Sequence, residues 1–350
     1  MGSESPTRSE HEPPTSTGDV GSPDGVLAAA PHLSDSDREI ITCLQADGRA
    51  SYASIAGRVG MTEKVVRSRV GALRAAGIID ITTVTDPRAL GYRFMSLIGV
   101  RATGAGSMRI ATQLARLDGV DYVVVTTGRY NVLVEVFSRT LPDLRHLVDT
   151  EIHAIPGVID VEVFPYLSLY YQEAAFEPAR SETKRELSRG DAPFEFDAVE
   201  LAIIRELNAD GRESFRSIGA RLGISETQVR RRVARMQETG ALRIMAIANP
   251  MTLGLEVVAF VGITVTPPVS TVEVAEALSN LPSVTYVAIC AARFNILAEI
   301  VCTAMEDMLR VLDSGIRTIP GVGEIEPFVY LDLQYRRVQP AGVRTARPAS

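Results

Sequence analysis

Apolar residues between positions 33 and 80 recur at the spacing of helices and predict three of them. A tight turn, Asp47-Gly48-Arg49, ends the first helix. Ser51 begins the second, and Gly60 ends it in the position of a left-handed C′ residue. The third helix has Thr62 as its N-cap and carries one apolar stripe at i, i+4 and i+7, formed by Val66, Val70 and Leu73. A short helix, a glycine turn and a longer helix form the helix-turn-helix arrangement.

Downstream of these helices the apolar pattern becomes that of strands. A strand from Ile78 to Val84 comes first, and positions 92–170 then read strand, helix, strand, strand, helix, strand. The order βαββαβ is typical of a ferredoxin-like α+β fold, a four-stranded antiparallel sheet with both helices on one face. Apolar side chains on the open face of such a sheet need a second sheet to bury them, so the pattern also predicts association.

The whole arrangement occurs twice. Asp47-Gly48-Arg49 returns as Asp210-Gly211-Arg212, 163 residues later, and Arg129-Tyr130-Asn131 matches Arg293-Phe294-Asn295 at an interval of 164. A repeat this long is a two-part protein duplicated and fused, rather than a solenoid unit of about 20–50 residues. We refer to positions 33–171 as copy one and to positions 195–337 as copy two.

Composition shifts mark the boundaries between the parts. The stretches before, between and after the copies are polar or rich in proline, and we expect them to be a disordered tail, a linker and a mobile tail. The predicted segments are a tail at 1–32, helix-turn-helix domain 1 at 33–85, ferredoxin-like domain 1 at 86–171, a linker at 172–194, helix-turn-helix domain 2 at 195–248, ferredoxin-like domain 2 at 249–337 and a tail at 338–350. The linker is long enough to let the copies pair within one chain or between chains.

Charge and composition fit a cytoplasmic protein. Hydrophobic residues make up 46% of the chain and charged residues 23%, which is typical of globular proteins. About four of the seven net negative charges belong to the N-terminal tail, so the acidity does not argue against nucleic-acid binding. No apolar stretch has the length of a membrane span, and no segment reads as a signal peptide. The cysteines Cys43, Cys290 and Cys302 sit in apolar segments and are expected to be buried and free.

The third helix of each copy is the candidate recognition helix. Side chains in its first two turns can reach base edges in the major groove, and hydroxyl groups near helix N-termini can hold phosphates. The candidate DNA-binding residues are Ser51, Tyr52, Glu63, Lys64, Arg67, Ser68, Ser214, Arg216, Thr227, Gln228, Arg230 and Arg231. Arg69 and Arg232 lie at the flank and would touch phosphate at most. The alternative is a plain helical bundle with solvated arginines, and the recurrence of the same turn glycine and arginine positions in both copies favours DNA.

At this point the chain resembles a known family, the leucine-responsive regulatory protein/AsnC (Lrp/AsnC) transcription regulators. The resemblance rests on L-x-x-x-D-x-x-I-x-x-x-L-x-x-D-G-R from Leu33, the Gly60 turn, Gly77-Ile78-Ile79, Thr127-Gly128-Arg129-Tyr130-Asn131 and Ile155-Pro156-Gly157-Val158. It implies a helix-turn-helix followed by a regulation-of-amino-acid-metabolism (RAM) domain in each copy. It also implies double-stranded DNA and a small-molecule effector, such as an amino acid, as partners, and homo-oligomers formed through the RAM sheets.

The family's effector turn maps onto residues 127–131 of copy one and 291–295 of copy two. The resulting candidate effector-binding residues are Thr127, Gly128, Arg129, Tyr130, Asn131, Arg293 and Asn295. Glycine lets backbone N–H groups approach a carboxylate, and an acid at the last position would pair with an ammonium group. Both copies carry Asn there, which accepts hydrogen bonds without ion pairing. The alternative is a purely structural turn, and copy two, with Ala291-Ala292 and Phe294, departs further from the family's pattern.

Two other functions compete with the regulator. Paired units of this kind also resemble sirohaem decarboxylases, enzymes that use histidines near a tetrapyrrole, but His146 and His153 lie on one predicted helix away from the effector turns. The other alternative is an effector-binding or architectural protein that does not read sequence. No nucleophile triad, phosphate loop or metal-ligand spacing is visible, and the acids Asp118 and Asp121 read as solvated. The sequence thus predicts a non-enzymatic regulator with no cofactor and no metal.

Overall fold

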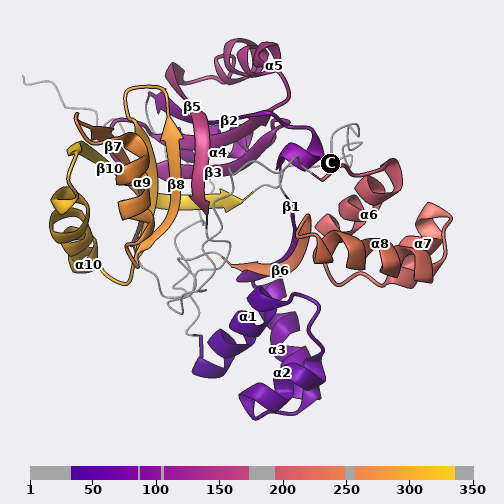
Figure 1. Cartoon of the computed structure of the whole chain (residues 1–350). Coiled ribbons are helices and arrows are strands. Elements are labelled where there is room, and N and C mark those ends of the chain that lie inside the picture. Colours follow the sequence, from indigo (N-terminus) through magenta and orange to yellow (C-terminus); the bar gives the residue numbers. More distant parts are fainter. Residues whose placement is uncertain (1–32, 86, 104–105, 173–193, 249–256, 336–350) are drawn as a thin grey trace, which may run out of the picture. The chain divides into compact units, whose positions relative to one another are not determined.

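The structure is a computed structural model that describes residues 33–85, 87–103, 106–172, 194–248 and 257–335 (Figure 1). The predicted tails at 1–32 and 338–350, and all but the ends of the predicted linker, lie outside these residues. In the described part, no helix is long and apolar enough to cross a membrane. No group of three or more potential metal ligands occurs there either.

The helix-turn-helix of copy one has the predicted elements. They are α1 (Asp35–Ala46), α2 (Tyr52–Val59) and α3 (Glu63–Ala75), followed by β1 (Ile79–Thr85). Local capping explains the helix starts, because Ser51 accepts a hydrogen bond from the Ser54 N–H and Thr62 accepts one from the Val65 N–H. Gly60 ends α2 at φ 66°, the left-handed conformation expected from the sequence.

Copy two repeats this layout. Its elements are α6 (Ala198–Ala209), α7 (Phe215–Leu222), α8 (Glu226–Glu238) and β6 (Leu242–Ala248). Ser225 and Gln228 form a capping box at the start of α8. The strands β1 and β6 pair antiparallel, with Thr82 opposite Met245. One apolar cluster runs through both helix-turn-helix units and this two-stranded ribbon, so the two units share a core.

The βαββαβ order is confirmed in both ferredoxin-like domains. Copy one has β2 (Phe94–Ala102), α4 (Ser107–Leu114), β3 (Val120–Thr126), β4 (Val132–Ser138), α5 (Leu141–His146) and β5 (Val158–Gln172). Copy two has β7 (Val257–Val265), α9 (Thr271–Ser279), β8 (Val284–Cys290), β9 (Ile296–Cys302), α10 (Met305–Arg310) and β10 (Val322–Tyr335). In copy one the second helix continues beyond α5 as a π-helix over Leu147–Ile152.

The two sheets close into one barrel with the order β10-β3-β4-β2-β5-β8-β9-β7. The long last strands make the closure possible. The first part of β5 pairs with β2 of its own copy and its second part pairs with β8 of copy two, while β10 pairs with β7 and with β3 in the same way. The open faces of both sheets therefore cover each other, as the apolar pattern predicted, and the partner sheet comes from the same chain.

Buried carboxylates occupy equivalent places in the barrel interior. Glu135 on β4 accepts hydrogen bonds from the hydroxyl groups of Tyr166 (3.0 Å) and Tyr286 (2.5 Å). Glu299 on β9 accepts them from Tyr330 (2.7 Å) and Tyr122 (2.8 Å). Each carboxylate thus binds one tyrosine of its own copy and one of the other, and hydrogen bonding compensates the burial of polar groups.

The surroundings of these carboxylates differ between the copies. Thr285 donates a hydrogen bond to Glu299, at 2.8 Å, whereas copy one has Asp121 at the equivalent position. Burial and the negative charge of Asp121 raise the pKa of Glu135 to about 7. Asp121 was expected from the sequence to be solvated, but it is half-buried, and its charge contributes to the raised pKa of the buried Glu135.

The pKa of Glu135 predicts that stability depends on pH. Between about pH 4.5 and about pH 7 the folded chain keeps a proton that the unfolded chain has released. The free energy of unfolding should therefore fall by up to about 3 kcal/mol as pH rises through this range, and level off above it. Urea unfolding at intervals from about pH 5 to about pH 8 measures this. A Glu135→Gln variant, which does not titrate, should lack the fall; equal pH slopes in both proteins would contradict the assignment.

The cysteines behave as predicted. Cys43, Cys290 and Cys302 are buried and unbridged. Burial raises the pKa of the Cys290 thiol to about 12, so this thiol stays protonated and packs as a small apolar side chain.

Candidate nucleic-acid interface and effector loops

The recognition helices α3 and α8 present equivalent arginines to solvent. The side chains of Arg67 and Arg230 are each 64% exposed. Each forms an ion pair one helical turn back, Arg67 with Glu63 at 2.5 Å and Arg230 with Glu226 at 2.6 Å. The remaining predicted reader positions are also exposed; they are Lys64, Ser68, Thr227 and Arg231. The structure therefore brings the predicted reading residues of each copy onto one accessible helix.

Several of the predicted phosphate-binding groups have a local structural task as well. Ser51 and Ser214 cap α2 and α7, where their hydroxyl oxygens accept backbone N–H groups, and their hydroxyl protons remain donors. The amide oxygen of Gln228 accepts the Ser225 N–H at 2.9 Å, which leaves its amino group for other contacts. Arg216 is exposed on α7.

Arg69 and Arg232 do not extend from the flank of the recognition helix as free phosphate contacts. Arg69 pairs with Asp37 at 2.7 Å. Arg232 pairs with Asp197 and lies 3.6 Å from Glu200. Both arginines thus tie the third helix to the capped start of the first helix, a contact between distant segments that local sequence patterns do not reveal.

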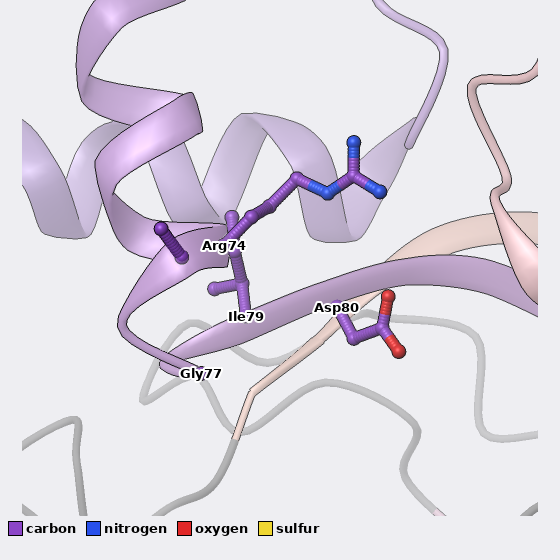
Figure 2. A pocket seen from close by; sticks show the side chains of 5 residues that line it. Arg74, Gly77, Ile79 and Asp80 are labelled. Carbon is purple, nitrogen blue, oxygen red and sulfur yellow. The ribbon is translucent and has the colours of Figure 1, made fainter.

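A shallow hollow lies beside the end of α3, and we assign no binding role to it. It is lined by Arg74, Ala75, Gly77, Ile79 and Asp80 (Figure 2). Its arginine makes an ion pair at 3.1 Å with Asp210 of the other copy. The hollow therefore lies against a contact between the copies, and copy two, with Gln237 in place of Arg74, has no equivalent arginine.

The Asp-Gly-Arg turns form a cross-copy contact that the sequence had indicated only as turns. Arg49 donates hydrogen bonds to the carbonyl oxygens of Gly211 (2.6 Å) and Glu213 (3.1 Å). Arg212 donates to those of Gly48 (2.7 Å) and Ala50 (3.1 Å). The repetition of the arginine in both copies was the available signal, but it could not show that each arginine reaches the opposite turn.

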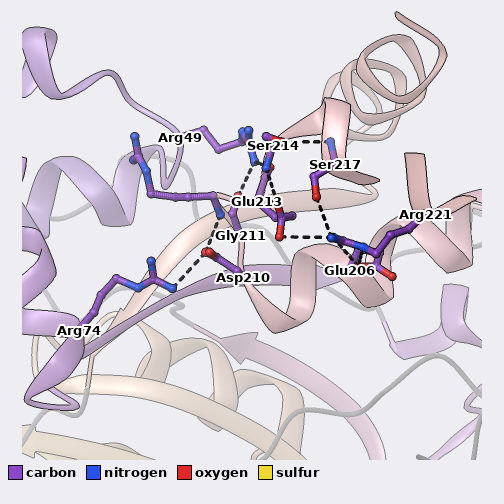
Figure 3. A network of polar contacts seen from close by, with 10 residues as sticks. Arg49, Arg74, Glu206, Asp210, Gly211, Glu213, Ser214, Ser217 and Arg221 are labelled. Carbon is purple, nitrogen blue, oxygen red and sulfur yellow. Dashed lines mark hydrogen bonds and ion pairs between the residues drawn. The ribbon is translucent and has the colours of Figure 1, made fainter. Parts of the chain in front are cut away.

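Copy two has an additional network around its turn. Figure 3 shows Arg221, at the end of α7, directed toward Glu206 and Glu213. Its ion pairs measure 2.7 Å and 3.3 Å, respectively. Copy one has Cys43 and Ala50 at the positions of these acids, so its turn cannot form the two ion pairs. The two readers are therefore held by different local contacts.

The predicted effector turn of copy one contacts the last strand of copy two. Gly128 has φ 93°, a conformation that favours glycine. The Thr127 hydroxyl accepts the Val329 N–H at 3.2 Å, and the Thr127 N–H donates to the Val329 carbonyl at 2.9 Å. At the equivalent contact, Ala291 of copy two has no hydroxyl group, and Pro165 of copy one, which corresponds to Val329, has no N–H to donate. Donor and acceptor are thus lost together.

The side chains of these turns already have partners in the protein. The side-chain amide oxygens (Oδ1) of Asn131 and Asn295 accept the N–H groups of Ala102 (2.7 Å) and Val265 (2.8 Å), so the two asparagines fix the sheet at the turn. The Tyr130 hydroxyl donates to Glu162, whereas Phe294 has no hydroxyl to do so. The asparagines replacing the family's acidic residue therefore have a structural role in both copies.

Arginines and glutamates from both copies form a small charged cluster between the turns. Arg129 pairs with Glu326 at 3.1 Å. Arg293 lies 3.7 Å from Glu162 and 3.9 Å from Glu326. Two guanidinium groups and two carboxylates are thus close together, and all are partly exposed. A ligand with a carboxylate could compete with a glutamate for either arginine.

Comparison with known proteins agrees with this geometry. The AsnC-type helix-turn-helix domain matches residues 33–74 and again 196–237. The Lrp/AsnC ligand binding domain matches residues 96–176, and the PF0864 C-terminal dimeric alpha+beta barrel domain matches residues 256–338. The chain belongs to the Lrp/AsnC family of transcription regulators. Within that family it carries the helix-turn-helix and the barrel-forming domain twice.

Lrp/AsnC relatives match this chain over a single copy. The HTH-type transcriptional regulator FL11 of Pyrococcus horikoshii is 33% identical over 127 residues, which is 36% of this chain and 83% of FL11. The HTH-type transcriptional regulator LrpA of Pyrococcus abyssi is 33% identical over 130 residues, 37% of this chain and 92% of LrpA. One copy of this chain thus corresponds to most of an Lrp/AsnC regulator.

A solved structure shares the fold of the duplicated chain. The siroheme decarboxylase NirDL aligns over 87% of this chain and 94% of its own, with a TM-score of 0.57 and 17% sequence identity. At this identity the likeness concerns the fold alone. It shows that the fold of this chain, over most of its length, occurs in another protein.

Proposed function

We propose that this chain is a sequence-specific DNA-binding regulator that carries both halves of a dimeric reader in one polypeptide. The observation that carries the proposal is the pairing of the copies within the chain, by the closed barrel and by the β1–β6 ribbon. A dimeric helix-turn-helix protein reads two half-sites related by its own symmetry. We also propose, from the composition of the chain, that it acts in the cytoplasm.

The charge of the recognition helices supports the proposal. The exposed face of α3 carries Lys64 and Arg67 against Glu63, and that of α8 carries Arg230 and Arg231 against Glu226, in a chain of net charge −7. Basic side chains concentrated on one helix are the electrostatic footprint of nucleic-acid binding. Arg67 and Arg230 are the residues that we propose to read guanine, since arginine can bind its O6 and N7 with two donors.

The readers are unequal, so we expect an imperfect palindrome as the preferred site. Lys64 corresponds to Thr227 and Ser68 to Arg231, which changes two reading positions between the half-sites. Selection of binding sites from random DNA by the purified full chain measures this, with salt concentration held fixed. Two related but unequal half-sites at constant spacing are the expected result. Recovery of a perfect palindrome would contradict unequal reading, and recovery of unrelated sequences would contradict sequence-specific binding.

We also propose that a small carboxylate-bearing effector, such as an amino acid, binds at the effector turn of copy one. Support comes from Gly128, which is exposed and has no side chain between a ligand and the backbone, and from Arg129, whose ion pair with Glu326 is partly exposed. Exposed ion pairs contribute only about 0–1 kcal/mol, so a ligand carboxylate can displace one at low cost.

Calorimetric titration of the chain with single amino acids tests the effector site. Saturable binding by at least one of them is expected, and Arg129→Ala should weaken it by about tenfold or more because a charge-assisted hydrogen bond is lost. Arg101→Ala is the matched control, since Arg101 forms a similar exposed ion pair with Asp160, at 3.1 Å. No binding by any amino acid, or equal loss in both variants, would argue against this site.

A further inference from the structure

Each Asp-Gly-Arg turn contacts the strand that follows the helix-turn-helix of the other copy, β6 for the turn of copy one and β1 for that of copy two. The Gly48 N–H donates to the carbonyl of Ile244 on β6 at 2.8 Å, and the Gly211 N–H donates to the carbonyl of Ile81 on β1 at 2.7 Å. Arg49 and Arg212, which follow these glycines, bind the opposite turn through two carbonyl oxygens each (Figure 3 shows Arg49). A guanidinium with several oriented donors is well suited to such a two-point contact.

The same arginines also contact an aromatic ring of the other copy. The guanidinium carbon of Arg49 lies 4.2 Å from the ring centre of Phe215, the first residue of α7. That of Arg212 lies 4.3 Å from the ring centre of Tyr52, the first residue of α2. Both distances are within the range of a cation–π interaction.

Each of these rings carries a reading arginine as well. Arg230 lies over Phe215, at 5.4 Å, and Arg67 lies over Tyr52, at 5.0 Å. A ring of one copy is thus shared by the reading arginine of that copy and by the turn arginine of the other. The contacts run from Arg49 through Phe215 to Arg230, and from Arg212 through Tyr52 to Arg67.

We propose that Arg49 and Arg212 are positioning residues that act on the half-site read by the opposite copy. Arg49 fixes Phe215 and thereby the direction of Arg230, and Arg212 does the same for Tyr52 and Arg67. The half-sites are then read in a fixed register, because neither recognition helix can turn without disturbing the turn arginine of the other copy. This inference rests on the proposed function, since it concerns how DNA is read.

The proposal predicts a crossed effect, which the unequal half-sites make measurable. Arg67→Ala and Arg230→Ala first assign each half-site to its reader. Discrimination is the ratio of the affinity for the preferred sequence to that for a sequence with one half-site altered. Arg49→Gln should lower this ratio about tenfold at the half-site of Arg230, and the ratio at the half-site of Arg67 should change by less than about threefold. Arg212→Gln should do the reverse. Both variants should also tolerate altered spacing between the half-sites better than the unmodified chain.

Further variants separate positioning from general destabilisation. Phe215→Leu removes the shared ring and should reproduce the effect of Arg49→Gln. Arg49→Lys keeps the charge, with its donors on a single nitrogen in place of the planar guanidinium, and should retain part of the discrimination. Circular dichroism at the assay temperature verifies that each variant is folded.

The outcomes distinguish this inference from the proposed function. If a variant lost discrimination at the half-site read by the copy that carries the substitution, or equally at both half-sites, the inference would be overturned and sequence-specific binding would stand. Unchanged discrimination at both half-sites in Phe215→Leu would overturn the inference too. If the unmodified chain selects no sequence at all, the proposed function fails, and the inference fails with it.

Discussion

Replacing Arg67 and Arg230 together by alanine is expected to lower affinity for the selected site by about 2–6 kcal/mol, or roughly 30-fold to roughly 20,000-fold. Each arginine that binds a guanine contributes about 1–3 kcal/mol of discrimination, and distant sites add. The ion pairs with Glu63 and Glu226 do not prevent this reading. Pairs of this i, i+4 type contribute only about 0.2–0.5 kcal/mol, so a base can displace the glutamate.

A gel-shift titration on specific and non-specific DNA, at two salt concentrations, measures the effect. The matched control is the double variant Arg310→Ala and Arg317→Ala, which also removes two exposed arginines paired one turn away, with Asp307 and Asp313. It should bind nearly as the unmodified chain does. If the reader variant lost affinity equally for both DNAs, Arg67 and Arg230 would hold phosphate and not read bases.

Adding one methyl group at Gly211 is expected to destabilise the protein by about 1–3 kcal/mol, the usual cost of overpacking. A Cβ at this position would lie 2.8 Å from the backbone nitrogen of Thr82 and 2.9 Å from the carbonyl carbon of Ile81. Both atoms belong to β1 in the β1–β6 ribbon, so the strand and not a flexible side chain has to move. Gly48→Ala should act in the same way, through Met245 on β6.

Chemical unfolding of the full chain, followed by circular dichroism, measures this loss. The same substitution at Gly71, in the middle of α3 with no atom near its Cβ position, should instead stabilise the chain by up to about 1 kcal/mol, because alanine favours helix. We expect the free energy of unfolding to fall in Gly211→Ala and to rise in Gly71→Ala. If Gly211→Ala were as stable as the unmodified chain, the close docking of the turn would be wrong.

The sequence predicted best what depends on neighbours along the chain. The helix start at Thr62 and the helix end at Gly60 follow from hydrogen bonds within about five residues, and the structure confirms both. The strand order of the ferredoxin-like domains and the burial of their open faces followed from apolar periodicity, and both are confirmed as well.

The contacts between the copies could not be predicted in this way. Pairing of β5 with β8, and of Arg49 with the turn at Gly211, joins residues more than a hundred positions apart, and the linker permitted pairing within or between chains. The interior position of Glu135 was equally hidden, because a lone acid in an apolar strand can face either side of a sheet. Its recurrence as Glu299 was the available signal. The roles assigned to the reading and effector residues remain predictions.

Closing the barrel within one chain has a consequence for inheritance and dosage. Both readers are made in equal number from one gene, and dilution in a growing cell cannot separate them. A mutation in a homodimeric regulator appears in both halves at once, whereas here it alters one half and spares the other. At the effector turns, Thr127 of copy one contacts Val329 of copy two, whereas the equivalent residues are Ala291 of copy two and Pro165 of copy one, which is divergence of this kind. One half of the molecule can therefore acquire a new specificity while its counterpart keeps the old one.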